Sequence, residues 1–207
     1  MRYPTLREEK KLWRQGYKRV ACLDEAGVGP LAGPVVAAAV YLNYKGFDLG
    51  FKISKIRDSK KLSAKKREIF YKLITKNRNI KWGIGIVSEK IIDKINVLEA
   101  TKIAMGKALK NLRQKPNFLI LDGRLKLNLK TKQKSIIKAD TKVLSCAMAS
   151  ILAKVTRDKL MDKYHASYSH YNFIKNKGYP TKFHFKMLKK YGICRIHRKS
   201  FRLIREN

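Results

Sequence analysis

The chain has 207 residues, 44% of them hydrophobic, and 49 lysines and arginines against 15 acidic residues give it a formal net charge of +34. This length favours one domain, and the hydrophobic content excludes a disordered chain. No apolar run is long enough to span a membrane, and the charge favours nucleic acid as partner over a lysine-rich coding bias. Three separated cysteines without a CxxC pair fit a reducing, cytoplasmic location.

The N-terminal part of the chain predicts a basic segment followed by two strands around a glycine-rich loop. Residues 1–17 are interpreted as a basic extension, either a short helix or a mobile arm, ahead of one domain at residues 18–207. Apolar runs predict strands at residues 19–23 and 35–42. The loop between them has three glycines and two prolines but lacks the Gly-Lys-Ser/Thr ending of a Walker A loop.

The central part follows a mixed, loop-rich segment at residues 43–62. A serine N-cap and apolar residues at helical spacing predict a helix at residues 63–76. Isoleucine and tryptophan alternate with glycine at residues 80–87, which is typical of a strand. A helical pattern then covers residues 88–112, with a break near Asn96.

The last third of the chain completes an α/β pattern. Short buried strands are predicted at residues 118–121 and 135–138, and helices at residues 143–164 and 181–191. A proline before the last helix and a glycine after it mark its two ends. Three strands followed by alternating strands and helices predict a mixed sheet with helices on both faces.

Four carboxylates, Asp24, Glu25, Asp122 and Asp140, each lie at or just beyond the end of a predicted strand. Ligands of open α/β sheets gather beyond such ends, so these side chains can converge there. Converging acids repel one another unless divalent cations hold them, and hard oxygen ligands favour Mg²⁺ or Mn²⁺ over zinc. The residues alone leave alternatives open: a turn at 122–123, a helix cap at Asp140, and salt bridges at Asp24 and Glu25.

Asp24 and Glu25 are neighbours, and adjacent strand residues point to opposite faces of a sheet. Both can join one metal cluster only if the strand bends or ends beside them, and Gly27 permits such a bend. The four histidines lack metal-ligand spacing and are interpreted as surface or structural residues.

Short motifs from about residue 18 to the C-terminus resemble, in order, those of the type 2 ribonucleases H, the ribonuclease HII family. They lie at residues 23–36, 58–63, 96–101, 121–123, 138–140, 149–158, 177–181 and 197–201. Each motif alone is weak, whereas seven or eight in the right order are not expected by chance.

The resemblance implies a ribonuclease H-like mixed sheet flanked by helices, with a helical C-terminal extension. It implies a monomeric, metal-dependent endoribonuclease of ribonucleotide excision repair that hydrolyses the RNA strand of RNA–DNA hybrids. The enzyme would also nick duplex DNA on the 5′ side of an embedded ribonucleotide, leaving 5′-phosphate and 3′-hydroxyl ends. Asp24, Glu25, Asp122 and Asp140 would be its catalytic residues and would bind two Mg²⁺ or Mn²⁺ ions.

The resemblance also implies which residues contact nucleic acid. They are Gly27, Val28, Gly29, Ser59, Lys60, Lys61, Ser150, Lys154, Arg157 and Tyr179. Amides of the glycine loop can meet the ribose 2′-hydroxyl, and Tyr179 can stack on a sugar or a base. Simpler interpretations stay open: a solvated lysine pair at 60–61, a surface ion pair of Lys154 with Asp158, and a packed loop aromatic at Tyr179.

Val28 departs from the family, whose loop usually has the sequence Gly-Arg-Gly. The missing arginine removes a bidentate phosphate donor, which puts affinity or single-ribonucleotide selectivity in question but not the reaction type. Two rival functions remain. The first, a non-catalytic nucleic-acid-binding module, explains the charge but not four acids at strand ends. A related enzyme with degraded activity is at odds with the presence of all four carboxylates.

Overall fold

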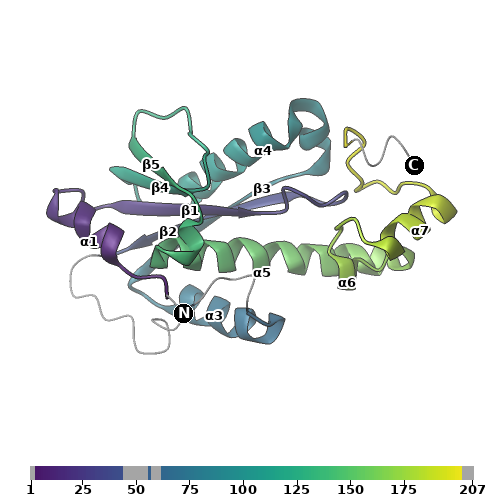
Figure 1. Cartoon of the computed structure of the whole chain (residues 1–207), viewed down its shortest axis with the longest axis horizontal. Helices are drawn as coiled ribbons and strands as arrows, with labels where there is room; N and C mark the ends of the chain where they lie inside the picture. Colours follow the sequence, from purple (N-terminus) through teal and green to yellow (C-terminus); the bar gives the residue numbers. More distant parts are fainter. Residues whose placement is uncertain (1–2, 44–55, 57–61, 202–207) are drawn as a thin grey trace.

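The computed structural model describes residues 3–43, 56 and 62–201. Its centre is a five-stranded mixed sheet with the strand order β3-β2-β1-β4-β5 (Figure 1). The strands are β1 (Val20–Ala26), β2 (Val35–Leu42), β3 (Ile80–Val87), β4 (Phe118–Asp122) and β5 (Lys132–Ile136). β1 is antiparallel to β2, β2 is antiparallel to β3, β1 is parallel to β4, and β4 is parallel to β5.

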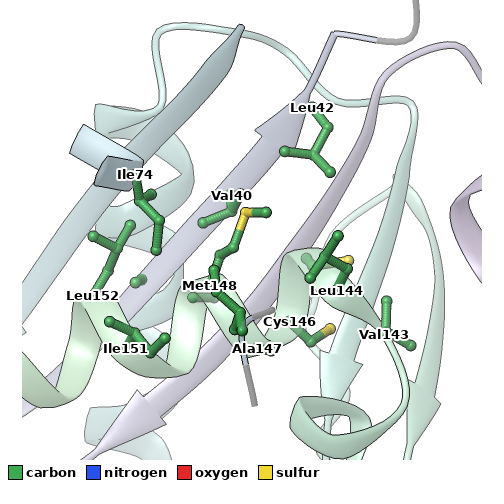
Figure 2. Packing of buried hydrophobic residues seen from close by; sticks show 14 of the residues in the cluster. Val40, Leu42, Ile74, Val143, Leu144, Cys146, Ala147, Met148, Ile151 and Leu152 are labelled. Carbon is green, nitrogen blue, oxygen red and sulfur yellow. The ribbon is translucent and has the colours of Figure 1, made fainter. Parts of the chain in front are cut away.

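Alternating side chains of the central strands divide between two helical layers. Val36 and Val40 of β2 face the layer of α3 (Ala64–Lys76) and α5 (Leu144–Ser167). Figure 2 shows Met148 of α5 directed at Val40. Val35 and Ala39 instead join the cluster that packs against α4 (Glu89–Asn111), which covers the other face in Figure 1. Both faces are therefore buried, which explains the uncharged run in β2.

The close packing of α4 on β3 requires glycine in the strand. A Cβ placed on Gly83 would lie 2.2 Å from the carbonyl oxygen of Ala108, and one on Gly85 would lie 1.9 Å from that of Ala104. The predicted break in α4 is confirmed, because Asn96 has a φ of 67°. The side chain of Asn96 accepts hydrogen bonds from the amides of Leu98 and Glu99 and so begins the second helical piece.

The N-terminal helix α1 (Arg7–Arg14) packs against the sheet rather than standing apart from it. Its Leu12 and Trp13 belong to the same core as α5. Its Glu9 is buried and accepts hydrogen bonds from the amide and the hydroxyl of Ser145, at 3.1 and 2.6 Å. This part of the predicted extension therefore shares the core of the predicted domain.

The C-terminal segment, at the yellow end of Figure 1, forms a small core together with Leu31 and Ala32 of the β1–β2 loop and Met161 of α5. It contains η3 (Ser169–Tyr171), α6 (Phe173–Asn176) and α7 (Lys182–Tyr191). These elements confirm the predicted α/β fold with its helical C-terminal extension. Among the helices of the described residues, none is long and apolar enough to cross a membrane.

One predicted strand is wrong in position. The strand expected at residues 135–138 lies at Lys132–Ile136, and Asp140 lies instead in the short helix η2 (Ala139–Thr141). Lys138 precedes η2 with a φ of 57°, a left-handed conformation that cannot continue a strand. The polar sequence of β5 offered no apolar alternation from which its bounds could be read.

Candidate active site

Three of the four predicted carboxylates meet at one edge of the sheet. Asp24, Asp122 and Asp140 each offer an oxygen, and these oxygens all lie within 4.8 Å of one another. The parallel pairing of β1 with β4 brings the first two together, because Leu23 and Leu121 are paired and each aspartate follows directly. Asp122 is the last residue of β4, as the prediction from strand ends expected. The expected end of the first strand at residue 23 is wrong, because β1 continues to Ala26 through its pairing with β2, so Asp24 lies within the strand.

Asp140 reaches the cluster through a backbone turn. The amide of Ala139 donates a hydrogen bond of 2.5 Å to Oδ1 of Asp122. This bond ties the end of β4 to η2 and so holds Asp140 beside the other two carboxylates. The same contact occupies an acceptor site on Asp122, which fixes the orientation of that carboxylate.

The environment of Asp24 disfavours its charged form. Burial raises the pKa of Asp24 well above the usual range, and the neighbouring charges of Glu25 and Asp122 raise it further. Hydrogen bonds from the hydroxyl of Ser150 and from the amide of Glu25, the latter at 2.7 Å, act in the opposite direction. A cation at the cluster would relieve this repulsion and favour the carboxylate form of Asp24.

Glu25 stands at the margin of the cluster. β1 continues through Ala26, so Asp24 and Glu25 are neighbours within one strand. Glu25 accordingly does not belong to the set whose oxygens lie within 4.8 Å of one another. Its charge still acts on Asp24, as the raised pKa of Asp24 shows.

The donor set fits a hard divalent cation. Three carboxylates supply only oxygen ligands, and the group contains no histidine or cysteine of the described residues. Such ligands suit Mg²⁺, Mn²⁺ or Ca²⁺ rather than zinc, which prefers nitrogen and sulfur. Asp24 and Asp140 are nearly inaccessible to solvent, whereas Asp122 is half-buried at the mouth of the cluster.

The predicted nucleic-acid contacts fall into two groups. Val28, Gly29 and Tyr179 are exposed, and a Cβ placed on Gly29 would lie 4.0 Å from Cε1 of Tyr179. Lys154 lies 5.8 Å from the centre of the Tyr179 ring and also pairs with Asp158 at 2.8 Å. The structure therefore brings together the glycine loop, Tyr179 and Lys154.

The other predicted contacts are not available at the surface or lie outside the described residues. Ser150 is buried and donates to Asp24, and Arg157 is fully buried with its guanidinium on backbone carbonyls. Neither side chain reaches the surface in this structure, because both donate hydrogen bonds to neighbouring buried groups. Ser59, Lys60 and Lys61 lie outside the described residues.

A cleft of about 690 Å³ opens beside Tyr179 and Lys154, between α3, α5 and α6. Six cationic and three acidic side chains line it. The cationic ones are Lys65, Arg67, Lys154, Lys159, Lys175 and Lys177. Because Tyr179 and Lys154 also line the cleft, it continues the surface that they form. Its excess of positive charge would attract a polyanion.

The sequence predicted no role near the site for His184, His197 or Arg198, although it led to the interpretation of the histidines as surface or structural residues. Nε2 of His184 lies 2.9 Å from Nε2 of His197, and Nδ1 of His184 lies 2.9 Å from the carbonyl of Tyr179. Arg198 follows directly and is fully buried. The motif at residues 197–201 was the one signal in the sequence that pointed to this segment.

A five-stranded mixed sheet with carboxylates of β1, β4 and η2 clustered at one edge defines the class: a metal-dependent nuclease of ribonuclease H-like fold. The model of the family described as Ribonuclease HII matches residues 21–204, and the chain belongs to this family. It is therefore a ribonuclease H2-type endoribonuclease, a divalent-metal hydrolase that acts on RNA–DNA hybrids.

Relatives and a solved structure agree with this assignment. Ribonuclease HII of Syntrophus aciditrophicus is 46% identical over 195 residues, which cover 94% of this chain and 89% of the relative. Ribonuclease HII of Chlamydia muridarum is 48% identical over 199 residues, covering 96% and 89%. The crystal structure of ribonuclease H2 from Pyrococcus horikoshii matches with a TM-score of 0.73 at 27% identity, covering 91% of this chain and 96% of that one.

Proposed function

We propose that this enzyme cleaves on the 5′ side of a ribonucleotide, within duplex DNA or an RNA–DNA hybrid, and leaves 5′-phosphate and 3′-hydroxyl ends. The observation that carries the proposal is the set of three carboxylate oxygens within 4.8 Å of one another. Asp24, Asp122 and Asp140 would hold the metal, and Glu25 would complete the ligand set from the margin. Two Mg²⁺ or Mn²⁺ ions bound there would stabilise charge on the attacking and leaving oxygens of the phosphodiester.

The residues around the cluster perform the remaining tasks. Ser150 favours the ionised form of Asp24 through its hydroxyl hydrogen bond, and Ala139 orients Asp122. In the loop at Gly27, Val28 and Gly29, Gly27 is buried, whereas Val28 and Gly29 are exposed. The backbone amides of this loop would meet a ribose 2′-hydroxyl, the group that distinguishes RNA from DNA.

The neighbouring surface would bind the rest of the duplex. Tyr179 is exposed and can stack on the sugar or base that follows the ribonucleotide. Lys154, with Ser59, Lys60 and Lys61, would contact phosphates, and the cationic cleft beside Tyr179 would extend this surface along the duplex.

A cleavage assay tests this function directly. Three duplexes are compared: one with a single ribonucleotide, an all-DNA duplex of the same sequence, and a long RNA–DNA hybrid. Each is incubated with Mg²⁺, with Mn²⁺, or with a chelator. We expect cleavage only of the two ribonucleotide-containing substrates and only with metal, with the single nick 5′ of the ribonucleotide. Cleavage of the all-DNA duplex, or cleavage that survives the chelator, would contradict the proposal.

We also propose that the enzyme acts as a monomer in the cytoplasm. All three cysteines of the chain are free, which supports a reducing compartment. Light scattering during size-exclusion chromatography gives the mass in solution, and a value of twice 24.0 kDa would contradict the monomer.

A further inference from the structure

Arg157 and Arg198 are both fully buried. Within the described part of the chain, no carboxylate lies within ion-pair distance of either guanidinium. The negative charges of Asp93 and Glu89 act on Arg198, yet the oxygens of Asp93 accept hydrogen bonds from the amides of Lys199 and Ser200. Because buried charges are normally paired with opposite charges, two unpaired guanidiniums need another explanation.

The burial of these two cations is unfavourable. Burial lowers the pKa of Arg157 to about 10. Burial, and then the positive charge of Arg157, lower the pKa of Arg198 to about 9. A pair of like charges held in the protein interior implies strong hydrogen bonding at each guanidinium.

Each of the three side-chain nitrogens of Arg198 donates a hydrogen bond to the glycine loop between β1 and β2. Its Nε donates to the carbonyl of Gly33 at 3.0 Å, its Nη1 to that of Val28 at 2.9 Å, and its Nη2 to that of Gly27 at 2.5 Å. The amide of Arg198 also donates to the carbonyl of Leu31 at 2.8 Å. This one residue therefore holds four carbonyls of the loop.

Arg157 holds the C-terminal end of the same loop. Its Nε donates to the carbonyl of Pro34 at 3.0 Å, its Nη2 to that of Ala32 at 3.0 Å, and its Nη1 to that of Lys177 at 2.9 Å. Its side chain passes so close to Gly27 that a Cβ there would lie 2.2 Å from Nε of Arg157. The guanidinium thus links the loop to the turn that carries Tyr179.

The hydrogen bonds to Arg198 also determine the direction of the loop's amide groups. No peptide bond of the described chain is cis, and in a trans peptide the N–H points opposite to the carbonyl of the preceding residue. The carbonyls of Gly27 and Val28 point at Arg198, so the N–H groups of Val28 and Gly29 point away from it. Neither N–H has a hydrogen-bond partner among the described residues.

We propose that Arg198, supported by Arg157, is a positioning residue for ribose recognition, which fixes two peptide planes so that the amides of Val28 and Gly29 face the substrate. This inference rests on the proposed function. It adds a specific cause for ribose selectivity: the amides are aimed by guanidiniums that never touch the nucleic acid. The two buried charges also make the loop electropositive in the absence of the family's loop arginine.

The test measures selectivity rather than activity alone. In an Asp122→Asn background, which we expect to bind without turnover, the dissociation constants of a single-ribonucleotide duplex and of the matching all-DNA duplex are compared. Arg198→Lys keeps the charge but loses the fork of donors. We expect the preference for the ribonucleotide to fall about tenfold or more while all-DNA binding stays unchanged. Arg195→Lys, on an exposed side chain of the same segment, is the matched control and should change neither constant.

Two results would overturn the proposal. One is an unchanged ribonucleotide preference in Arg198→Lys, and the other is an equal loss of affinity for both duplexes, which indicates general damage to the fold. If Arg198→Lys melts below the assay temperature, Arg157→Lys is measured in the same way and should lower the same preference. Failure of the proposed function itself is recognised separately, since the wild-type enzyme would then not nick the single-ribonucleotide duplex.

Discussion

The amide of Ala139 donates a hydrogen bond of 2.5 Å to Oδ1 of Asp122, and this contact joins the end of β4 to the turn that carries Asp140. The cluster is thus built from one strand pair and one backbone turn. Its remaining member, Asp24, comes from β1 and is held by the hydroxyl of Ser150 on α5. The carboxylates are oriented by protein groups before any metal arrives, which is the preorganisation that metal sites require.

Ser150→Ala should weaken the metal site without disturbing the fold. The hydroxyl lowers the pKa of Asp24, so its loss raises that pKa further and makes the carboxylate form less available. Hydrogen bonds to charged groups contribute about 1.5–3 kcal/mol, which sets the expected loss in apparent Mg²⁺ affinity. Metal-titrated cleavage rates measure it, with the acidic limb of the pH–rate profile moving to higher pH. Ser167→Ala, exposed at the end of α5, is the control, and equal behaviour of the two variants would remove Ser150 from the site.

The buried histidine pair should make the fold sensitive to acid. Burial, and then the charge of the nearby His184, lower the pKa of His197 to about 4. The unfolded chain titrates near pH 6.5, so it binds more protons than the folded chain between pH 4 and 6.5, and stability is lost as the pH falls through that window. The contribution is about 3 kcal/mol by the energy of each pKa unit.

Urea unfolding at pH 7 and pH 4 measures this effect. Asp24, whose pKa is raised, opposes it in the same range, so the comparison is made between variants. His197→Asn should lose less stability on acidification than the wild type, whereas His170→Asn, at an exposed position, should behave as the wild type does. An identical pH dependence in His197→Asn would exclude the histidine pair as the cause.

Affinity for duplexes should fall steeply with salt. Each neutralised phosphate contributes about −0.9 to the slope of log affinity against log salt concentration. Lys60→Ala should reduce the magnitude of that slope by about one if Lys60 contacts a phosphate. Lys115→Ala, which precedes β4 at the end of the sheet opposite the carboxylates, should leave it unchanged. A slope that is the same in both variants would place Lys60 outside the interface.

Val28→Arg should increase the affinity for a duplex that contains a single ribonucleotide. Val28 is 40% exposed and its carbonyl is already held by Arg198, so a longer side chain has room to extend without moving the backbone. A new charged hydrogen bond to a phosphate would contribute about 1.5–3 kcal/mol, seen as a higher kcat/KM on the single-ribonucleotide duplex. Equal values for parent and variant, on this duplex and on a long hybrid, would mean that neighbouring lysines already supply the missing charge.

Much of the fold could be predicted because local signals coincide with the element ends. The bounds of β2 and β3 match the predicted 35–42 and 80–87, and Ser63 caps α3 as expected, accepting from the amide of Lys66. β5 could not be placed, because all of its residues except Ile136 are lysines or other polar residues.

Part of the site could be predicted from the sequence and part could not. The sequence predicted the convergence of Asp24 and Asp122, which directly follow the paired residues Leu23 and Leu121, but it did not predict that β1 continues past Asp24 to Ala26. The partners of Arg157 and Arg198 in the glycine loop could not be predicted, because these carbonyls lie more than 120 residues away from the arginines in the chain. Carbonyls carry no side-chain signature, so an arginine that orders a loop has the same appearance in a sequence as one that binds phosphate.

The central claim is that the three clustered aspartates hold the metal on which cleavage depends. The most direct test is the rate of nicking of a single-ribonucleotide duplex in Mg²⁺ by the wild type and by Asp122→Asn, each with a thermal melt to verify folding. Removing one metal-binding charge should cost several kcal/mol of transition-state stabilisation, so we expect a folded variant whose cleavage is undetectable. Near-normal turnover by a folded Asp122→Asn protein would contradict the account.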